Sequence, residues 1–293
     1  MSTASLLNWA LQTGIAITAL TGFILLIRRP FAQRFGAGVA YTLWALPVLR
    51  VFMPPVTLPV LKPEILPVTI APGLTAPSPV PGSFQTGTVA STPNFPLLIL
   101  TLWIGIAALW LTREAVRQRL YIRKLRTQST TMSGPCALLA GKAMRAANLK
   151  TMPDIRISDT HTGPLVTGLR RPLIILPKNF ETHFHPQQQY FALLHEMTHI
   201  KRRDLWAAFA VLLFRALNWP NPLIHFAAHK FRVDQEAACD ASVLKLIDAN
   251  KNAHAYAETL VHAAKSVKNP TKAAPLGLTI YHPLKERLMM MTS

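Results

Sequence analysis

The sequence predicts a chain that starts with apolar membrane helices and continues as a basic domain of helices and short strands, an α+β arrangement. Two features of its composition lead to this fold class. Half of the 293 residues are hydrophobic and only 15% are charged, whereas about 25% charge is usual in soluble domains. The acidic residues are also unevenly distributed, because residues 1–112 contain only Glu64 of the 13.

Three apolar stretches predict transmembrane helices, at about residues 6–27, 37–53 and 96–112. The first has 22 residues without charge, and at 1.5 Å per residue it would span roughly 33 Å, enough to cross a bilayer core. The second is the weakest candidate, because Pro47 and Arg50 lie inside it. Residues 1–126 are therefore predicted to form a membrane region.

The basic residues predict how this region is oriented. They follow the first and third apolar stretches, at 28–34 and at 113–126, whereas residues 54–95 contain one lysine and one glutamate. By the positive-inside rule, residues 54–95 form an outward loop and residues 127–293 form a cytoplasmic domain. The loop holds ten of the 24 prolines, so we expect an extended connector there.

The net charge of +18 then reflects membrane topology, and a nucleic-acid partner is not expected because no binding motif appears.

The second half alternates between helical and extended patterns. Apolar spacing predicts a helix within 133–149, and alternation predicts a strand at 154–158. Residues 173–176 form an apolar run between two prolines, which predicts an edge strand that could pair with an extended substrate. A helix is predicted from Pro186 onward, since proline suits a first helical turn.

That helix contains the motif H-E-x-x-H, formed by His195, Glu196 and His199. Residues four apart lie on one face of a helix, so both imidazoles can reach a single metal ion. Glu196 projects beside them and can accept a proton from an attacking water. The motif therefore predicts a zinc site with Glu196 as the catalytic base.

A catalytic zinc ion usually has three protein ligands, and residues 234–244 offer the third. Glu236 and Asp240 are four apart on a predicted helix, so Glu236 could bind the metal while Asp240 holds the outer nitrogen of a histidine ligand. Cys239 is interpreted as a small buried thiol. Asp204 is assigned a structural role at the end of the H-E-x-x-H helix.

The apolar stretch 205–228 is long enough to be considered as a fourth transmembrane helix. A crossing would place His199 and Glu236 on opposite sides of the membrane, where one metal ion could not bind both. The stretch also contains two prolines, Pro220 and Pro222. We therefore predict a helical hairpin that contacts the membrane without crossing it.

Taken together, these segments resemble the BlaR/MecR-type antirepressor membrane metallopeptidases of bacteria. The resemblance rests on four motifs: T-G-L-R-R-P-L-I-I-L-P at 167–177, H-E-M-T-H-I-K-R-R-D at 195–204, W-P-N-P-L at 219–223 and E-A-A-C-D at 236–240. It implies a gluzincin-like domain in the bacterial inner membrane, with zinc ligands His195, His199 and Glu236 and catalytic Glu196. Antibiotic-sensing members carry a fourth span and a C-terminal penicillin-binding sensor; this sequence has neither, so direct β-lactam sensing is not expected.

The predicted function is that of a membrane zinc endopeptidase whose active site faces the cytoplasm and which acts in signal transduction. The resemblance implies a transcriptional repressor, or the chain itself, as substrate; membrane lipid is the other partner, and a homodimer is left open. Two alternatives are a CAAX-processing-type membrane protease and a transducer without enzymatic activity. Several side chains could stabilise the oxyanion, with no basis for choice among them: His225, His229, His254, Tyr256 and Tyr281.

Overall fold

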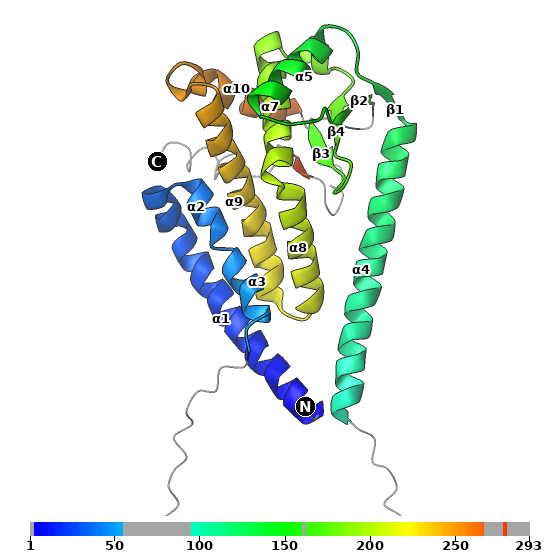
Figure 1. Cartoon of the computed structure of the whole chain (residues 1–293), viewed down its shortest axis with the longest axis vertical. Helices are drawn as coiled ribbons and strands as arrows, with labels where there is room; N and C mark the ends of the chain where they lie inside the picture. The colour runs from blue at the N-terminus through cyan, green and yellow to red at the C-terminus, as the bar shows by residue number, and fades with distance from the viewer. Residues whose placement is uncertain (1–2, 55–94, 160, 162, 267–277, 280–293) are drawn as a thin grey trace, which may run out of the picture.

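Long helices and a small sheet make up the chain. The computed structural model describes residues 3–54, 95–159, 161, 163–266 and 278–279. Figure 1 shows two long helices, α1 (Thr3–Phe35) and α4 (Phe95–Thr127), running along the length of the molecule on either side of a central helical hairpin. The sheet lies at the end where α4 finishes.

The predicted second span is not one helix. A turn at Gly36, whose φ of 87° suits glycine, leads into two short helices, α2 (Ala37–Thr42) and α3 (Ala45–Val51). Proline explains the break between them, because Pro47 has no N–H to offer the carbonyl of Leu43 four residues earlier. That carbonyl accepts from the main chain of Leu46 instead, at 3.0 Å. The apolar stretch 37–53 thus forms two short helices, and its crossing of the membrane stays a prediction.

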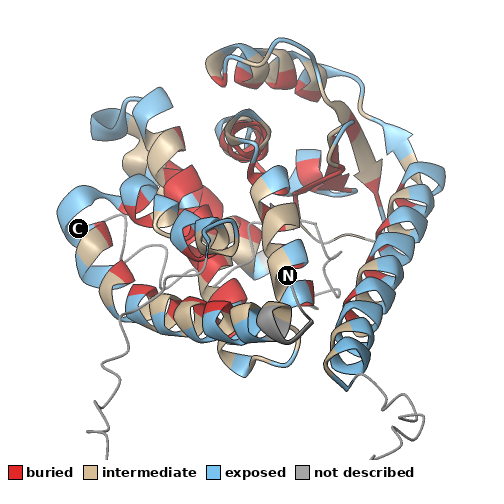
Figure 2. Ribbon diagram, turned by 60° about the horizontal axis from the view of Figure 1, so that its bottom comes forward, coloured by how far each residue is buried: buried red, intermediate tan, exposed pale blue. Residues whose placement is uncertain are grey.

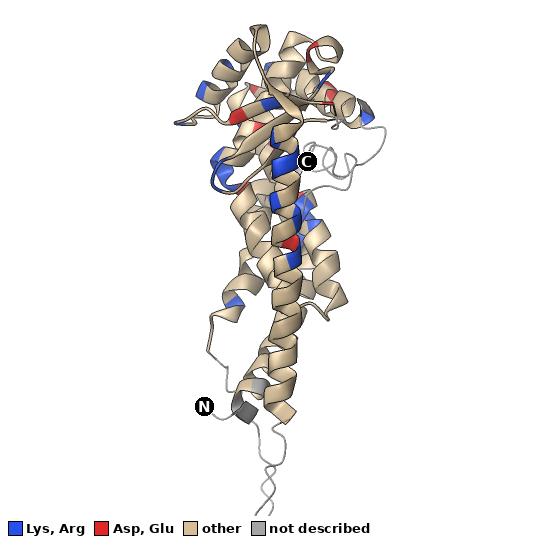
Figure 3. Ribbon diagram, turned by 90° about the vertical axis from the view of Figure 1, so that its right-hand side faces the viewer, with Lys and Arg blue, Asp and Glu red and all other residues tan. Residues whose placement is uncertain are grey.

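Two helices are long and apolar enough to cross a membrane by length and composition. They are residues Asn8–Phe35 of α1 and the whole of α4. Figure 3 shows that lysine and arginine occur only along the second half of α4, toward the sheet. The three arginines predicted to lie in a loop after the first span, Arg28, Arg29 and Arg34, lie inside α1, and Arg28 is only 4% exposed.

The sheet has five strands in the order β1-β2-β4-β3-β5. They are β1 (Ser129–Thr131), β2 (Asp154–Ser158), β3 (Leu165–Thr167), β4 (Leu173–Pro177) and β5 (Leu278–Thr279). The central strand β4 pairs parallel with β2 and antiparallel with β3. The prediction that residues 173–176 form an edge strand is therefore wrong, and a substrate cannot pair there. Both flanking prolines lie at the strand ends, where a missing N–H interrupts no interior pairing.

The two faces of β4 pack against different helices. Ile174 and Leu176 join the main core, which includes residues of α5 (Pro135–Ala146) and α7 (Pro186–Arg202). Leu173 and Ile175 pack instead against Leu125 near the end of α4. Figure 2 shows the buried residues concentrated on α7, the sheet and the helices beside them. A short helix, α6 (Phe180–His183), precedes α7.

The stretch predicted as a hairpin consists of α8 (Asp204–Leu217) and the start of α9 (Pro222–Leu246). Asn221 begins α9 by accepting the Leu223 N–H at 3.0 Å. The turn lies beside the middle of α1 and the first third of α4: Asn221 donates to Thr18 of α1 at 2.7 Å, and Trp103 of α4 donates to the Leu217 carbonyl at 2.8 Å.

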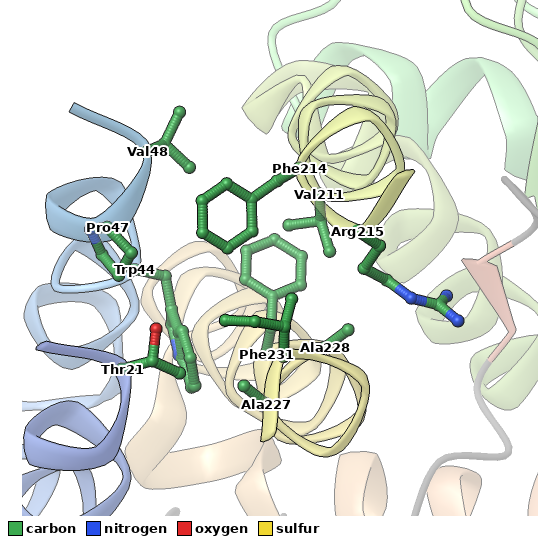
Figure 4. A pocket seen from close by; sticks show the side chains of 11 residues that line it. Thr21, Trp44, Pro47, Val48, Val211, Phe214, Arg215, Ala227, Ala228 and Phe231 are labelled. Carbon is green, nitrogen blue, oxygen red and sulfur yellow. The ribbon is translucent and has the colours of Figure 1, made fainter. Parts of the chain in front are cut away.

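The hairpin also packs against the N-terminal helices. Ile24 of α1 and Trp44 form a buried cluster with Ala227 and Phe231 of α9. Figure 4 shows the small apolar cavity beside this cluster. Its free volume is about 20 Å³, room for about one water molecule. The last helix, α10 (Ala249–Ser266), follows α9.

Candidate metal centre

Helix α7 carries the H-E-x-x-H motif through the core. Pro186 occupies its first turn, and the Gln188 side chain accepts the His185 N–H at 3.1 Å, which satisfies a free donor at the helix start. The residues from Phe191 to His199 are all buried. The motif therefore lies on a rigid helix, away from water.

Histidine and carboxylate atoms converge at one point. The Nε2 atoms of His195 and His199 lie 3.1 Å apart. One oxygen of Glu236 lies 3.4 Å from the first of these nitrogens, and the other oxygen lies 3.5 Å from the second. The three side chains are at most 1% exposed. The structure therefore brings the three predicted ligands together, although they come from α7 and α9.

A fourth possible ligand, Cys239, lies at the same point. The ligand atoms of His195, His199 and Cys239 lie within 4.8 Å of one another, so these three side chains could hold a metal ion. Cys239 follows Glu236 by three residues on α9, and residues at this spacing share a helix face. The thiol also contacts the His195 carbonyl at 3.6 Å. The sequence placed Cys239 in the core but not at the metal centre.

The chemistry of the cluster suits a divalent cation. Four carboxylates that are at most 1% exposed surround the two imidazoles: Glu196, Asp204, Glu236 and Asp240. Arg202 pairs with Asp204 at 3.1 Å. Burying several anionic groups together is costly without compensating positive charge, and two imidazoles with a carboxylate or thiolate form a typical zinc ligand set.

The pKa values of the imidazoles point in the same direction. Burial lowers the pKa of each histidine, but the facing acidic groups raise it by more, so both pKa values lie well above the usual 6.5. For His195 these groups include Cys239, Asp240 and Glu236. Burial raises the pKa of the Cys239 thiol, and the two histidines lower it by more. The centre thus attracts positive charge, whether a proton or a metal ion.

An aspartate fixes the orientation of His199. Its Nδ1 lies 2.7 Å from the Asp204 carboxylate, which accepts a hydrogen bond from it. The other nitrogen, Nε2, is then left to face His195 and Glu236, where a metal ion would bind. This role was missed, because Asp204 follows the helix end and was assigned an anchoring role. Arg203, which precedes Asp204, has a left-handed φ of 60°. This turn ends α7 and brings the Asp204 side chain back to His199.

His195 is oriented by two residues behind it. Its Nδ1 lies 2.8 Å from the Tyr256 hydroxyl, which in turn donates to Asp240 at 2.7 Å. Asp240 itself lies 3.3 Å from the same nitrogen. Asp240 therefore occupies the predicted position. Tyr256, a candidate for oxyanion stabilisation, contacts Nδ1 of His195, on the side of the ring away from Nε2 and the candidate metal position. It therefore cannot face a carbonyl oxygen bound at that position.

Other predicted candidates have other surroundings. Both ring nitrogens of His225 are engaged, one by Arg215 at 3.4 Å and one near the Trp219 carbonyl at 2.9 Å. His254 is 90% exposed and lies 3.2 Å from Glu258. Tyr281 lies outside the described residues. The group that stabilises the oxyanion therefore stays unassigned among the described residues.

Contacts from the N-terminal helices reach the centre. The Gln235 side chain donates to the Tyr41 hydroxyl and to the Asp204 carbonyl, both at 3.0 Å. The neighbouring Asp234 accepts from Arg28 at 2.5 Å and from Trp44 at 2.8 Å. These buried and partly buried bonds connect α1 and α2 to the part of α9 that contains Glu236.

Comparisons with known proteins give one family match and several relatives. The family model described as BlaR1 peptidase M56 matches residues 8–291. The chain is 31% identical to the regulatory protein BlaR1 of Bacillus licheniformis over 129 residues, 43% of this chain and 21% of that protein. It is 25% identical to the methicillin resistance mecR1 protein of Staphylococcus aureus over 201 residues, 67% of this chain and 34% of that protein.

A third relative, the regulatory protein BlaR1 of Staphylococcus aureus, is 24% identical over 166 residues, 57% of this chain and 28% of that protein. The chain thus aligns with about a third or less of each relative's length. The family model, in contrast, covers nearly all of the chain. With this coverage, the chain belongs to the BlaR1 peptidase M56 family.

Proposed function

We propose that this chain is an integral membrane zinc metalloendopeptidase whose active site faces the cytoplasm. One observation carries the proposal: two imidazole nitrogens 3.1 Å apart face both oxygens of Glu236 at 3.4 and 3.5 Å, in a fully buried cluster. Glu196 lies beside them on α7 and is 0% exposed. Membership of a peptidase family supports the same activity.

The residues have separate roles in the proposed reaction. His195, His199 and Glu236 would hold the metal, with Cys239 as the further candidate. A bound zinc ion supplies a Lewis acid that polarises a peptide carbonyl and makes a nearby water more acidic. Glu196 accepts the proton of the attacking water and passes it to the departing amine. Asp204, and Tyr256 with Asp240, keep the two imidazoles in the orientation that binding requires.

The position of the hairpin turn supports a membrane-embedded arrangement. Helix α8 has 14 residues, so it is about 21 Å long and too short to cross a bilayer core of about 30 Å. Its turn contacts Thr18, near the middle of α1, and Trp103, near the middle of the apolar stretch 96–112 that begins α4. If α1 and α4 cross the membrane, the hairpin enters it from the side of the metal centre and returns.

A role in signal transduction follows from the relatives, which are named regulatory or resistance proteins. The proposed substrate is a transcriptional repressor in the cytoplasm or the chain itself. Two alternatives have less support. A CAAX-processing-type protease would match the zinc site but not the family, and a transducer without enzymatic activity would have no need for a glutamate at position 196.

The decisive experiment compares the wild type with Glu196→Gln, in membranes and after purification. The substitution keeps the size of the side chain and removes the base. We expect self-cleavage or repressor cleavage to be lost while about one zinc per chain remains. Loss of zinc would instead mean that Glu196 supports the site itself. If the wild type binds zinc and cleaves neither itself nor a repressor, while Glu196→Gln still blocks signalling in cells, the transducer would be the better description.

A further inference from the structure

A second cavity lies away from the metal centre. It has a volume of about 430 Å³, within the range of about 300–1,000 Å³ that small-molecule sites occupy. Its walls come from the end of α4, the connection before β2, strand β2 itself, the connection between β3 and β4, and one residue of α7, Ile200. None of the side chains proposed to hold or orient the metal lines it.

Arginine dominates the polar lining of this cavity. Four arginines and one aspartate contribute to it: Arg126, Arg156, Arg170, Arg171 and Asp154. Arg156 neutralises the aspartate, because its Nε lies 3.1 Å from both carboxylate oxygens. It also donates to the Arg126 carbonyl at 3.0 Å. The other three arginines are exposed, and none forms an ion pair with another described residue.

The loop that carries two of these arginines is held in a fixed conformation. Gly168 begins it with a φ of 92°, and a Cβ at this position would lie 2.6 Å from the Arg171 carbonyl oxygen. Only glycine fits such a close approach. Leu169 packs against the main core and Pro172 leads directly into β4. Arg170 and Arg171 are thus presented from a rigid turn rather than a loose surface loop.

Like charges gathered around one cavity repel each other, so the arrangement favours an anionic ligand. Guanidinium groups bind phosphate oxygens through paired hydrogen bonds, and several of them can meet adjacent phosphates. The remaining walls are largely apolar and include Leu149, Met152, Pro153 and Ile200. These would contact the uncharged part of a compact ligand. A concave site of this size is typical of a small-molecule ligand, whereas a macromolecular partner usually contacts a flatter surface.

We propose that this arginine-lined cavity is a binding site for a small phosphorylated molecule that carries adjacent phosphate groups. The site is independent of the metal centre and of the proposed peptidase activity. It lies where the end of α4, the sheet and α7 meet, so a bound ligand would contact the helix that leads out of the predicted membrane region and the helix that carries His199.

Calorimetric titration of the purified full chain with inorganic pyrophosphate tests this proposal. We expect saturable binding that weakens at least tenfold in the double variant Arg170→Gln/Arg171→Gln. The matched control, Arg119→Gln/Arg123→Gln, removes the same charge from exposed positions on α4 that do not line the cavity, and should change the affinity less than twofold. Gly168→Ala should also weaken binding, although it keeps every arginine.

Three results would overturn the proposal. The first is the absence of saturable pyrophosphate binding to the wild type. The second is an equal loss of affinity in the two double variants, which would mean that only overall charge matters. The third is tighter binding of a hexaglutamate peptide than of pyrophosphate at the same salt concentration, which would assign the cavity to acidic peptides instead. Thermal unfolding of each variant verifies that the chain is folded in the assay.

Discussion

Tyr41 of α2 and Asp204 of α8 share one hydrogen-bond donor, the side-chain amide of Gln235, which lies 3.0 Å from the tyrosine hydroxyl and 3.0 Å from the aspartate carbonyl. The carboxylate of the same aspartate lies 2.7 Å from His199. A residue of the N-terminal helices is thus two side chains away from a proposed metal ligand. Arg202 strengthens the connection, since its guanidinium stacks 5.4 Å from the Tyr41 ring and pairs with Asp204 at 3.1 Å.

This relationship predicts that Tyr41→Phe weakens zinc binding. The change removes one partly buried hydrogen bond and leaves the Gln235 amide less constrained, which should loosen Asp204 and His199. A bond of this kind contributes about 0.5–1.5 kcal/mol, so we expect a loss of about 2- to 10-fold in zinc affinity. Competition with a chromophoric chelator would measure it.

The matched control is Thr18→Val, which removes a hydrogen bond between α1 and the hairpin turn, at Asn221, without touching the metal centre. It should leave the zinc affinity unchanged. Equal losses in Tyr41→Phe and Thr18→Val would show that any weakening of the helix packing affects the metal, and that Tyr41 has no particular role.

A second prediction separates the two candidate ligands on α9. Both Glu236 oxygens face an imidazole nitrogen, within 3.5 Å, whereas the Cys239 thiol belongs to the same cluster at distances of up to 4.8 Å. We therefore expect Glu236→Ala to remove most of the zinc and Cys239→Ser to retain it. Metal analysis gives the stoichiometry of each variant.

Cobalt substitution adds a spectroscopic measurement. A thiolate ligand to cobalt produces an intense near-ultraviolet charge-transfer absorption, and an oxygen ligand does not. Without that absorption in the wild type, Cys239 would be a neighbour of the metal only. An intense absorption that disappears in Cys239→Ser would make the thiol a ligand.

A third prediction concerns pH. Both imidazoles must lose a proton to bind zinc, and their pKa values in the metal-free chain lie well above 6.5. Protonation therefore stabilises the metal-free folded chain below pH 6.5, and this contribution is lost as the pH rises through the raised pKa values. Zinc affinity should rise steeply over that window, with up to about two protons released per ion. Titrations between pH 6 and 9 would measure the slope, and a flat profile would contradict the raised pKa values.

Local patterns predicted the parts of the site that depend on one helix. Helical periodicity alone predicted that His195 and His199 share a helix face. Glu236 was predicted as the third ligand because residues 234–244 have the pattern of a helix. Asp204 was missed because its position depends on a left-handed turn at Arg203, and no pattern in the sequence predicts that conformation for an arginine. Tyr256 was only one of five candidates for oxyanion stabilisation, because its contact with the outer nitrogen of His195 depends on how α10 packs, which only tertiary structure determines.

The same division applies to the fold. The helix start at Pro186 and the strand over 154–158 followed from local sequence, and the structure confirms them. The edge position of residues 173–176 failed because it depends on β3, a strand of three residues that is too short for a recognisable alternation. The pairing between strands therefore escaped prediction, whereas periodicity within an element did not.

The final prediction concerns the depth of the hairpin turn. In a chain with Cys136→Ser and Cys239→Ser, three single cysteines report position: Ser83→Cys in the predicted outward loop, Lys178→Cys on the basic domain and Pro220→Cys at the turn. Lys178 is 70% exposed in its side chain, and Pro220 is also exposed in the structure. Poor reactivity at Pro220 would therefore report lipid around it rather than burial by protein.

With a membrane-impermeant maleimide we expect Ser83→Cys to react only from outside and Lys178→Cys only from inside, as the distribution of basic residues predicts. Pro220→Cys should react from neither side, because an α8 of about 21 Å ends within a bilayer core of about 30 Å. Reaction of Pro220→Cys from outside would mean that α8 spans the membrane. Reaction from inside as fast as Lys178→Cys would place the hairpin in the cytoplasm, and α1 and α4 could not then cross at Thr18 and Trp103, the residues that contact the turn.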